Sequence, residues 1–339
     1  RANAGVDVAL LNDRLNLSLD VYSSVTTHLL VQKQFQDAVG LNSYWTNDGK
    51  LGNKGFELTM NAKVINLSTF HWELGASMGH YRNEILSLSG DPIHTQVLDG
   101  EVITQVGSAA GLFYGYKTEG VYSTVAEAAN ANLQTITPNG TYAKFGAGDV
   151  RFVDVVRNGV KDGIIDANDK QVIGNPNPDL YGSFTNKFSY KNLMLTALFT
   201  FSYGNDVYNY QRSLLESGKD FSNQTLSMLN RWTSENQVTN QPRATYGDPM
   251  GNARFSDRWI EDGSYLRLKS LILSYNLPVK SRLLQSINVW ASANNLLTFT
   301  KYLGLDPEFS NQNSVLYQGV DAGMLSAGKS YNVGVKFSL

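Results

Sequence analysis

The chain has 339 residues, with 28 basic and 30 acidic side chains, a formal net charge of −2 and no cysteine. The near-neutral balance excludes the basic surface with which proteins bind nucleic acid. The lack of cysteine excludes disulfides, thiolate metal sites and cysteine nucleophiles. Mean hydropathy is −0.26, a value that alternating membrane strands also produce because their polar and apolar residues average out.

Alternating apolar and polar residues predict β-strands along the whole chain. The strands are expected at 6–10, 15–22, 56–64, 70–79, 180–188, 193–203, 265–275, 287–293 and 331–339. Most of these runs are close to the ~9 to 11 residues that a tilted membrane strand requires. Within 265–275 the apolar residues change parity. A β-bulge near Lys269 or Ser270 would restore a single apolar face, because one extra residue flips every later side chain.

Charged side chains in these strands fall on the polar parity. They are Asp7, Asp20, Glu57, Lys63, Glu73, Lys187 and Lys336. A Lys or Arg near mid-bilayer on the lipid face costs about 2 to 4 kcal/mol, whereas a water-filled lumen accepts either sign. The pattern therefore predicts an all-β fold, a transmembrane antiparallel β-barrel. Two alternatives stay open: a soluble glycan-binding β-sandwich, whose apolar faces turn inward, and a small self-contained outer-membrane barrel, including a hydrolytic one.

The connections between strands alternate in length. Short ones are expected at 12–14, 65–69, 190–192 and 278–286, and long ones at 27–53, 80–178, 204–263 and 297–329. In outer-membrane barrels short turns are periplasmic and long loops extracellular, so the chain is expected to begin outside and end inside. That requires an odd number of strands, nine by this pattern or eleven if the longest loop hides a hairpin. Because complete single-chain bacterial barrels have even numbers, residues 1–339 are expected to be part of a larger barrel.

The segment Asp149–Asp169 approaches the pattern of an EF-hand calcium loop. The expected ligands are Asn158, Asp162, Asp166 and Asp169. Val160, at the third ligand position, removes one oxygen. Two interpretations therefore stay open: a loop that binds Ca²⁺, and a polar, turn-rich loop that binds no metal.

The long loop 204–263 contains the other candidate site residues. Leucines spaced as on a helix over Gln211–Trp232 predict a helix that packs within its own loop. Trp232, Tyr246 and Trp259 are candidate substrate-binding residues, because aromatic faces stack on sugar rings or peptide side chains. The alternative is a structural one, since barrels carry girdles of aromatic residues at both membrane interfaces.

The sequence gives no positive case for an enzyme. The four histidines show no metal-ligand spacing on a helix, and no nucleophile elbow, phosphate loop or zinc motif is present. Glu261 and Asp262 are adjacent, so on a strand they would point to opposite faces. They are expected at a solvated rim.

Several long runs resemble one family, the C-terminal part of SusC/RagA-like TonB-dependent outer-membrane transporters. They are LGNKGFELTMNAKVIN (51–66), DANDKQVIGNPNPDLYGSFTNKFSYKN (166–192), SDRWIEDGSYLRLKSLILSYNLP (256–278) and ASANNLLTFTKYLGLDPE (291–308). The resemblance implies a barrel of about 22 strands with a plugged lumen, of which the chain would supply the C-terminal strands. It further implies a SusD-like lipoprotein at the outer mouth and energy from the TonB complex. The implied function is import of an oligosaccharide or peptide across the outer membrane of a Gram-negative bacterium, in contact with its lipids.

The resemblance leaves parts of the family without a counterpart. The plug, the TonB-contacting segment and the first half of the barrel are not matched within 1–339, so energy coupling is not expected on this chain. The acidic loop is usually a compact Asp-x-Asn-Gly-Asp-Gly run in the family, and here it is stretched between Val155 and Lys161. That departure weighs against calcium.

Overall fold

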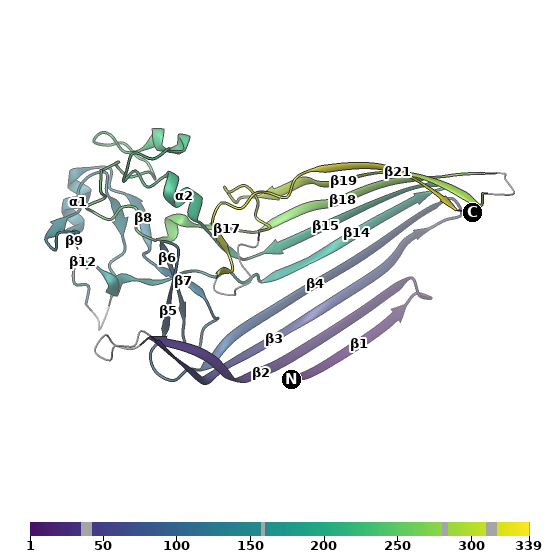
Figure 1. Ribbon diagram of the computed structural model, residues 1–339, viewed down its shortest axis with the longest axis horizontal. Coiled ribbons are helices and arrows are strands. Elements are labelled where there is room, and N and C mark those ends of the chain that lie inside the picture. Colours follow the sequence, from purple (N-terminus) through teal and green to yellow (C-terminus); the bar gives the residue numbers. More distant parts are fainter. Residues whose placement is uncertain (35–42, 157–159, 280–283, 310–316, 339) are drawn as a thin grey trace.

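The computed structural model describes residues 1–34, 43–156, 160–279, 284–309 and 317–338. Nine antiparallel strands form one sheet in the order β1-β2-β3-β4-β14-β15-β18-β19-β21 (Figure 1). Their bounds are Ala2–Leu10 (β1), Leu15–Gln34 (β2), Ser43–Asn66 (β3), Phe70–Ser87 (β4), Leu180–Tyr190 (β14), Leu193–Tyr203 (β15), Tyr265–Leu277 (β18), Ser286–Thr300 (β19) and Ser330–Ser338 (β21). The nine predicted strands are confirmed.

The short turns lie at one end of the sheet and the long connections at the other, with the N-terminus at the loop end and the C-terminus at the turn end (Figure 1). One expected loop is largely strand. β2 has 20 residues and β3 has 24, so this hairpin extends through most of 27–53. Register irregularities between Thr26 and Leu29, and between Leu29 and Val31, interrupt the alternation there, which is why the sequence pattern predicted a loop.

The predicted bulge in β18 is confirmed at Lys269. Leu198 of β15 pairs with Ser270, and the next residue, Phe199, pairs with Leu268, so Lys269 has no partner. The pairing of β18 with β19 shifts at the same place. Because of this extra residue, Leu268 and Leu271 lie on the same face of the sheet.

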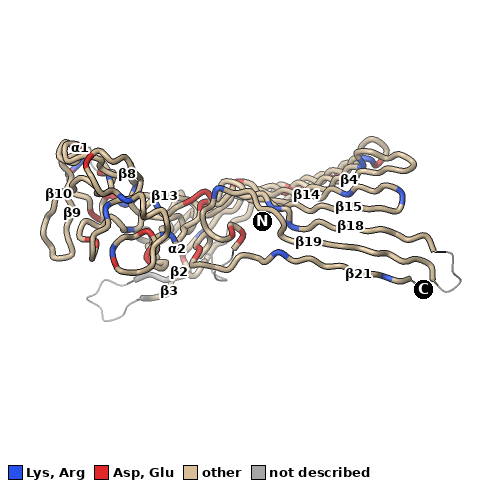
Figure 2. The backbone as a smooth tube through the Cα atoms, turned by 90° about the horizontal axis from the view of Figure 1, so that it is seen from above, with Lys and Arg blue, Asp and Glu red and all other residues tan. Residues whose placement is uncertain are grey.

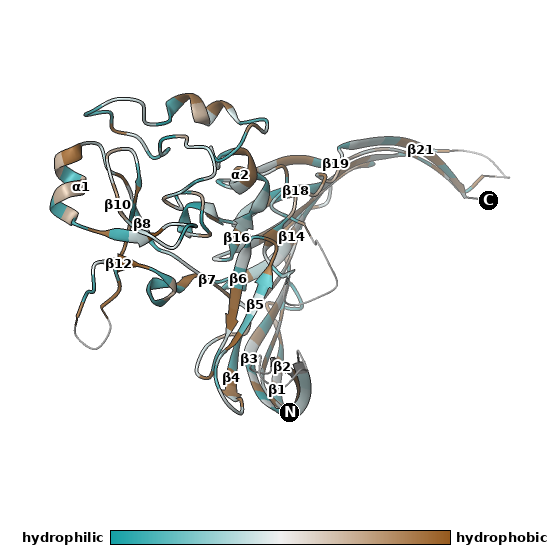
Figure 3. Ribbon diagram, turned by 60° about the vertical axis from the view of Figure 1, so that its left-hand side comes forward, coloured by the Kyte–Doolittle hydropathy of each residue, from teal (hydrophilic) through white to brown (hydrophobic). Residues whose placement is uncertain are grey.

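The sheet curves like a section of a barrel wall (Figure 3), and its two faces differ. One face is mainly apolar, and at its centre Phe184 of β14 stacks on Phe199 of β15 with ring centroids 4.8 Å apart. Charged residues are sparse along the strands and dense in the loops (Figure 2). Among the described residues, no helix is both long and apolar enough to cross a membrane.

The long connections fold together into a loop module at one end of the sheet (Figure 1). Its strands are β5 (Ile93–Val97), β6 (Gly100–Thr104), β7 (Leu112–Gly115), β8 (Thr118–Val121), β9 (Gln134–Ile136), β10 (Tyr142–Lys144), β11 (Val150–Phe152), β12 (Ile164–Ile165), β13 (Gln171–Gly174), β16 (Asp206–Asn209), β17 (Ile260–Asp262) and β20 (Val320–Asp321). They form four small sheets separate from the wall. No strand of the longest loop joins the nine-stranded sheet in the described part of the chain.

The module's helices are short. They are α1 (Val125–Ala131), α2 (Tyr210–Leu215) and the 3₁₀ turns η2 (Ala167–Asp169), η3 (Leu226–Asn230) and η4 (Asp257–Trp259). The single helix expected over Gln211–Trp232 is therefore wrong, because the chain leaves the helical path after Leu215 and coils again only at Leu226. One hydrophobic core joins three long loops through Phe113, Trp259 and Val320.

Candidate functional site

The polar face of the sheet carries side chains that the strand register aligns in rows across β2, β3 and β4. From the loop end toward the turns the rows are Ser24–Asn53–Asn83, Tyr22–Gly55–Tyr81, Asp20–Glu57–Gly79 and Ser18–Thr59–Ser77. Strand β14 extends the last two rows with Tyr181 and Ser183. Nearer the turns the polar face carries an ion pair, in which Lys187 Nζ lies 3.0 Å from Glu73 Oε2.

Two tyrosines in these rows lie over glycines. A Cβ atom at Gly55 would be 2.6 Å from the Tyr22 hydroxyl, and one at Gly79 would be 2.9 Å from the Tyr181 hydroxyl. The missing side chains therefore let both rings lie against the sheet. Tyr81 meets Tyr181 edge to face, with ring centroids 6.1 Å apart, and donates a hydrogen bond of 3.2 Å to Asn177 Oδ1.

The loop module folds back over the polar face near the bulge. Arg267 of β18 is 2% exposed and forms an ion pair with Asp306 of the connection after β19. Lys269, turned inward by the bulge, contacts both carboxylate oxygens of Glu308 at 2.9 Å. Bulges commonly redirect a side chain in this way. The two cations thus fix the connection after β19 to the inner wall.

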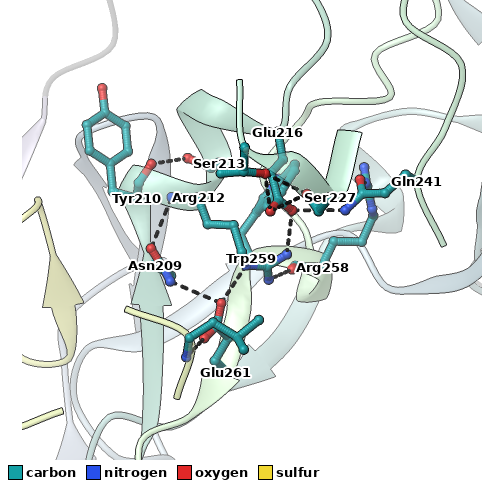
Figure 4. Close-up of polar contacts among 12 residues, drawn as sticks. Asn209, Tyr210, Arg212, Ser213, Glu216, Ser227, Gln241, Arg258, Trp259 and Glu261 are labelled. Atoms are coloured by element: carbon teal, nitrogen blue, oxygen red, sulfur yellow. Dashed lines mark hydrogen bonds and ion pairs between the residues drawn. The ribbon is translucent and has the colours of Figure 1, made fainter. Parts of the chain in front are cut away.

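A buried polar network joins the loops above the wall (Figure 4). Arg212 Nε lies 2.5 Å from Glu261 Oε1, and Arg212 Nη1 lies 3.2 Å from Glu216 Oε2. Glu261, whose side chain is 9% exposed, also accepts a hydrogen bond from Asn209. The expectation of a solvated rim for Glu261 is therefore wrong, because the Arg212 guanidinium compensates its burial.

Glu216 is the most fully bonded carboxylate of this network. It accepts hydrogen bonds from Thr225, Ser227 and Gln241 in addition to the contact with Arg212. Burial alone would raise the pKa of Glu216, but these hydrogen bonds and the Arg212 charge outweigh burial and lower that pKa below its usual range. The carboxylate therefore stays ionised and holds α2 to the following loop.

The three predicted substrate-binding aromatics have different surroundings. Trp259 is fully buried, with the guanidinium carbons of Arg212 and Arg258 at 5.2 and 4.6 Å from its ring centroid. It packs the core and presents no open ring face, which corrects its assignment to substrate binding. Trp232 is half-buried and donates a hydrogen bond of 3.1 Å to the Ser123 carbonyl, joining two long loops.

Tyr246 is 74% exposed and is one of five strongly exposed apolar side chains of loop 204–263, together named here the loop crest. The loop crest consists of Phe221, Leu226, Leu229, Val238 and Tyr246, which are 74% to 92% exposed. The rings of Phe221 and Tyr246 stack with centroids 5.1 Å apart. Exposed apolar side chains that pack on one another, as Phe221 and Tyr246 do, are typical of an interaction surface.

The described carboxylates of the acidic loop accept hydrogen bonds from backbone groups. Asp166 caps η2 by accepting from Asn168 N at 2.7 Å, and Asp169 accepts from Val155 N and Asp166 N at 2.8 Å each. Asp162 accepts from Ile164 N. Asn158 lies outside the described residues, and within the described ranges no group of three acidic or histidine side chains is placed to hold a metal. Calcium binding stays a prediction.

The aligned rows were not predicted as a site. The parity of the strands places Tyr22 and Tyr181 on the polar face, but periodicity within one strand gives no register between strands. Tyr22, Tyr81 and Tyr181 are far apart in the sequence and meet only through the pairing of β2, β3, β4 and β14. No pattern within a single strand could therefore have revealed this site.

Comparison with known proteins finds relatives that match nearly the whole chain, although no protein-family model matches it. The chain is 34% identical over 98% of its length to TonB-dependent receptor P3 of Formosa agariphila, and 28% identical over 94% to TonB-dependent receptor SusC of Bacteroides thetaiotaomicron. The solved RagAB peptide transporter has the same fold, with a TM-score of 0.79 at 24% identity, over 99% of this chain and 34% of that one.

The chain spans about a third of the length of these relatives, 33% of the first and 30% of the second. Its curved sheet has one apolar and one polar face and carries its long loops at a single end, as expected for a transmembrane barrel wall. Sequence similarity and architecture therefore agree. The chain belongs to the TonB-dependent receptors of the Gram-negative outer membrane, which include SusC, and forms part of their barrel.

Proposed function

We propose that the protein to which this chain belongs imports a nutrient across the outer membrane with energy from the TonB complex. The observation that carries the proposal is the difference between the two faces of the wall. Apolar side chains such as Phe184 and Phe199 suit contact with lipid, whereas the opposite face presents carboxylates, amides and hydroxyls to a water-filled lumen. The names of the relatives support a receptor, and one solved relative is a peptide transporter.

A SusD-like surface lipoprotein is the proposed partner, and the loop crest is its proposed contact. The crest lies at the end of the molecule opposite the short turns (Figure 1), which is the extracellular end of an outer-membrane barrel. Phe221 is 92% exposed and Leu229 is 74% exposed, and covering such side chains with a partner removes apolar surface from water. Tyr246 is proposed to contact this partner as part of the loop crest, and its role in substrate binding stays a prediction.

Deletion of the full-length gene is expected to abolish growth on at least one oligosaccharide or peptide source, because this import route is lost. Loss of TonB should abolish growth on the same source, and free glucose and amino acids, which pass general porins, serve as controls. Growth that is unchanged on every oligosaccharide and peptide source would contradict import.

Leu229→Asp is expected to release a lipoprotein that co-purifies with the full-length protein, since it places a charge on the apolar loop crest. Asp220→Asn, a change at another exposed position of the same loop, is the control and should leave co-purification unchanged. Equal recovery of the lipoprotein with both variants would exclude the loop crest as its contact.

A further inference from the structure

The inner wall carries a tyrosine shelf, defined as Tyr22 of β2, Tyr81 of β4 and Tyr181 of β14, which the pairing of four neighbouring strands brings together. Tyr22 and Tyr181 lie over glycines, which lets each ring lie against the sheet on the polar face. Tyr181 is 37% exposed. A planar group already lies against one ring, since the Arg1 guanidinium carbon is 5.5 Å from the Tyr22 centroid.

The shelf is not part of an aromatic girdle. Girdles lie on the lipid face of a barrel at the membrane interfaces, and the three tyrosines share the polar face with Asp20 and Glu57. Tyr203 of β15 provides the contrast. It is close to the shelf, because its neighbour Ser202 pairs with Tyr181. However, it lies on the opposite face and is 63% exposed there.

Apart from Arg1, whose guanidinium lies against Tyr22, the side chains around the shelf are neutral or acidic. Above it lies the amide row Ser24–Asn53–Asn83, and below it the hydroxyl row Ser18–Thr59–Ser77. The positions in the four aligned rows contain no Lys or Arg, and their charged members are Asp20 and Glu57. The basic side chains of these strands' polar face lie nearer the turns, where Lys187 is paired with Glu73.

We propose that the tyrosine shelf binds neutral oligosaccharides on their way to the lumen. The inference rests on the proposed import function and assigns its substrate class. The apolar face of a sugar ring packs on a tyrosine ring. The sugar hydroxyls donate hydrogen bonds to carboxylates such as Glu57, and they both donate to and accept from the side chains of the amide and hydroxyl rows. The partly exposed ring of Tyr181 matches the apolar face of a sugar ring, and the acceptors and donors of the neighbouring rows match its hydroxyls.

Two other substrate classes fit this surface less well. An extended peptide is commonly held through main-chain hydrogen bonds at a free strand edge, and here β2, β3, β4 and β14 are each paired on both sides. A sulfated or uronic-acid glycan carries negative charge, which Asp20 and Glu57 would repel. The shelf therefore favours uncharged sugars.

The test is affinity capture by the purified full-length protein in detergent. The protein is incubated with a mixture of neutral oligosaccharides from partial hydrolysis of starch, inulin, xylan and galactan, together with a tryptic digest of casein. Mass spectrometry then identifies what is retained, and calorimetry with the retained compound measures its affinity. Retention of oligosaccharides in preference to peptides is expected.

Tyr181→Ala should weaken the affinity about tenfold, equivalent to roughly 1.4 kcal/mol. Tyr181→Phe keeps the ring and should retain most of the affinity, which separates binding from a folding defect. Tyr203→Ala removes the same side chain from the opposite face and should have no effect. Retention of peptides instead of sugars, retention of neither class, or equal affinities for Tyr181→Ala and Tyr203→Ala would overturn the inference. Import that remains TonB-dependent in any of these cases would leave the proposed function standing.

Discussion

Phe184→Lys is expected to block assembly of the full-length protein in the outer membrane, whereas Thr185→Lys, one residue away, should leave assembly nearly unchanged. Both positions lie near the middle of β14, but on opposite faces. Phe184 pairs with Ala76 and Phe199 on the apolar face. A lysine there costs about 2 to 4 kcal/mol near the bilayer midplane, and the ring stack with Phe199 is lost as well.

The measurement is the folded fraction recovered from outer membranes, detected by the heat-dependent electrophoretic mobility of intact barrels. Phe184→Leu is the control for the lost ring, and should assemble far better than Phe184→Lys because it introduces no charge. If the lysines at 184 and 185 impaired assembly equally, the assignment of the two faces would be wrong.

Glu216→Ala is expected to loosen the loop module while the barrel wall stays folded. Glu216 is 5% exposed, and its loss leaves the Arg212 guanidinium with fewer partners in a buried setting. Removing one partner of a buried ion pair typically costs about 3 to 5 kcal/mol. Limited proteolysis should therefore cut loop 204–263 much faster in the variant.

Glu119→Ala is the matched control, because Glu119 forms an exposed pair with Arg151 at 3.6 Å, and such pairs contribute about 0 to 1 kcal/mol. The pH dependence provides a second readout. Because the folded state lowers the pKa of Glu216, its stabilisation is complete above the ordinary carboxyl range and is lost as the pH falls through the lowered pKa. Glu216→Gln should remove this acid sensitivity. Proteolysis rates that do not differ between Glu216→Ala and Glu119→Ala would show that the network does not hold the loop.

The barrel wall could be predicted from the sequence because its physical constraints are periodic. Each strand must separate lipid from water across its two faces, so Leu195 and Lys187 reveal their environments by parity alone. The bulge at Lys269 was also predictable, since the apolar residues change parity there. The hairpin of β2 and β3 was underestimated, because its bulges remove the alternation on which the prediction depends.

The loop module was far less predictable. Its core residues, such as Phe113 and Trp259, come from separate loops and show no common period. Glu261 resembles a solvated carboxylate in the sequence, and only the position of Arg212 on α2 explains its burial. The tyrosine shelf likewise depends on register across four strands, which one strand's pattern cannot supply.

The central claim is that the nine-stranded sheet separates lipid from a water-filled lumen. This chain contains no cysteine. After replacement of every cysteine elsewhere in the full-length protein, single cysteines can be introduced along Leu193–Tyr203 of β15 and spin-labelled in the membrane. Collision with oxygen, which concentrates in lipid, and with a water-soluble nickel reagent should alternate with a period of two residues, oxygen dominating at Leu195, Ala197 and Phe199. Equal access of the nickel reagent to both sets of positions would contradict the membrane wall.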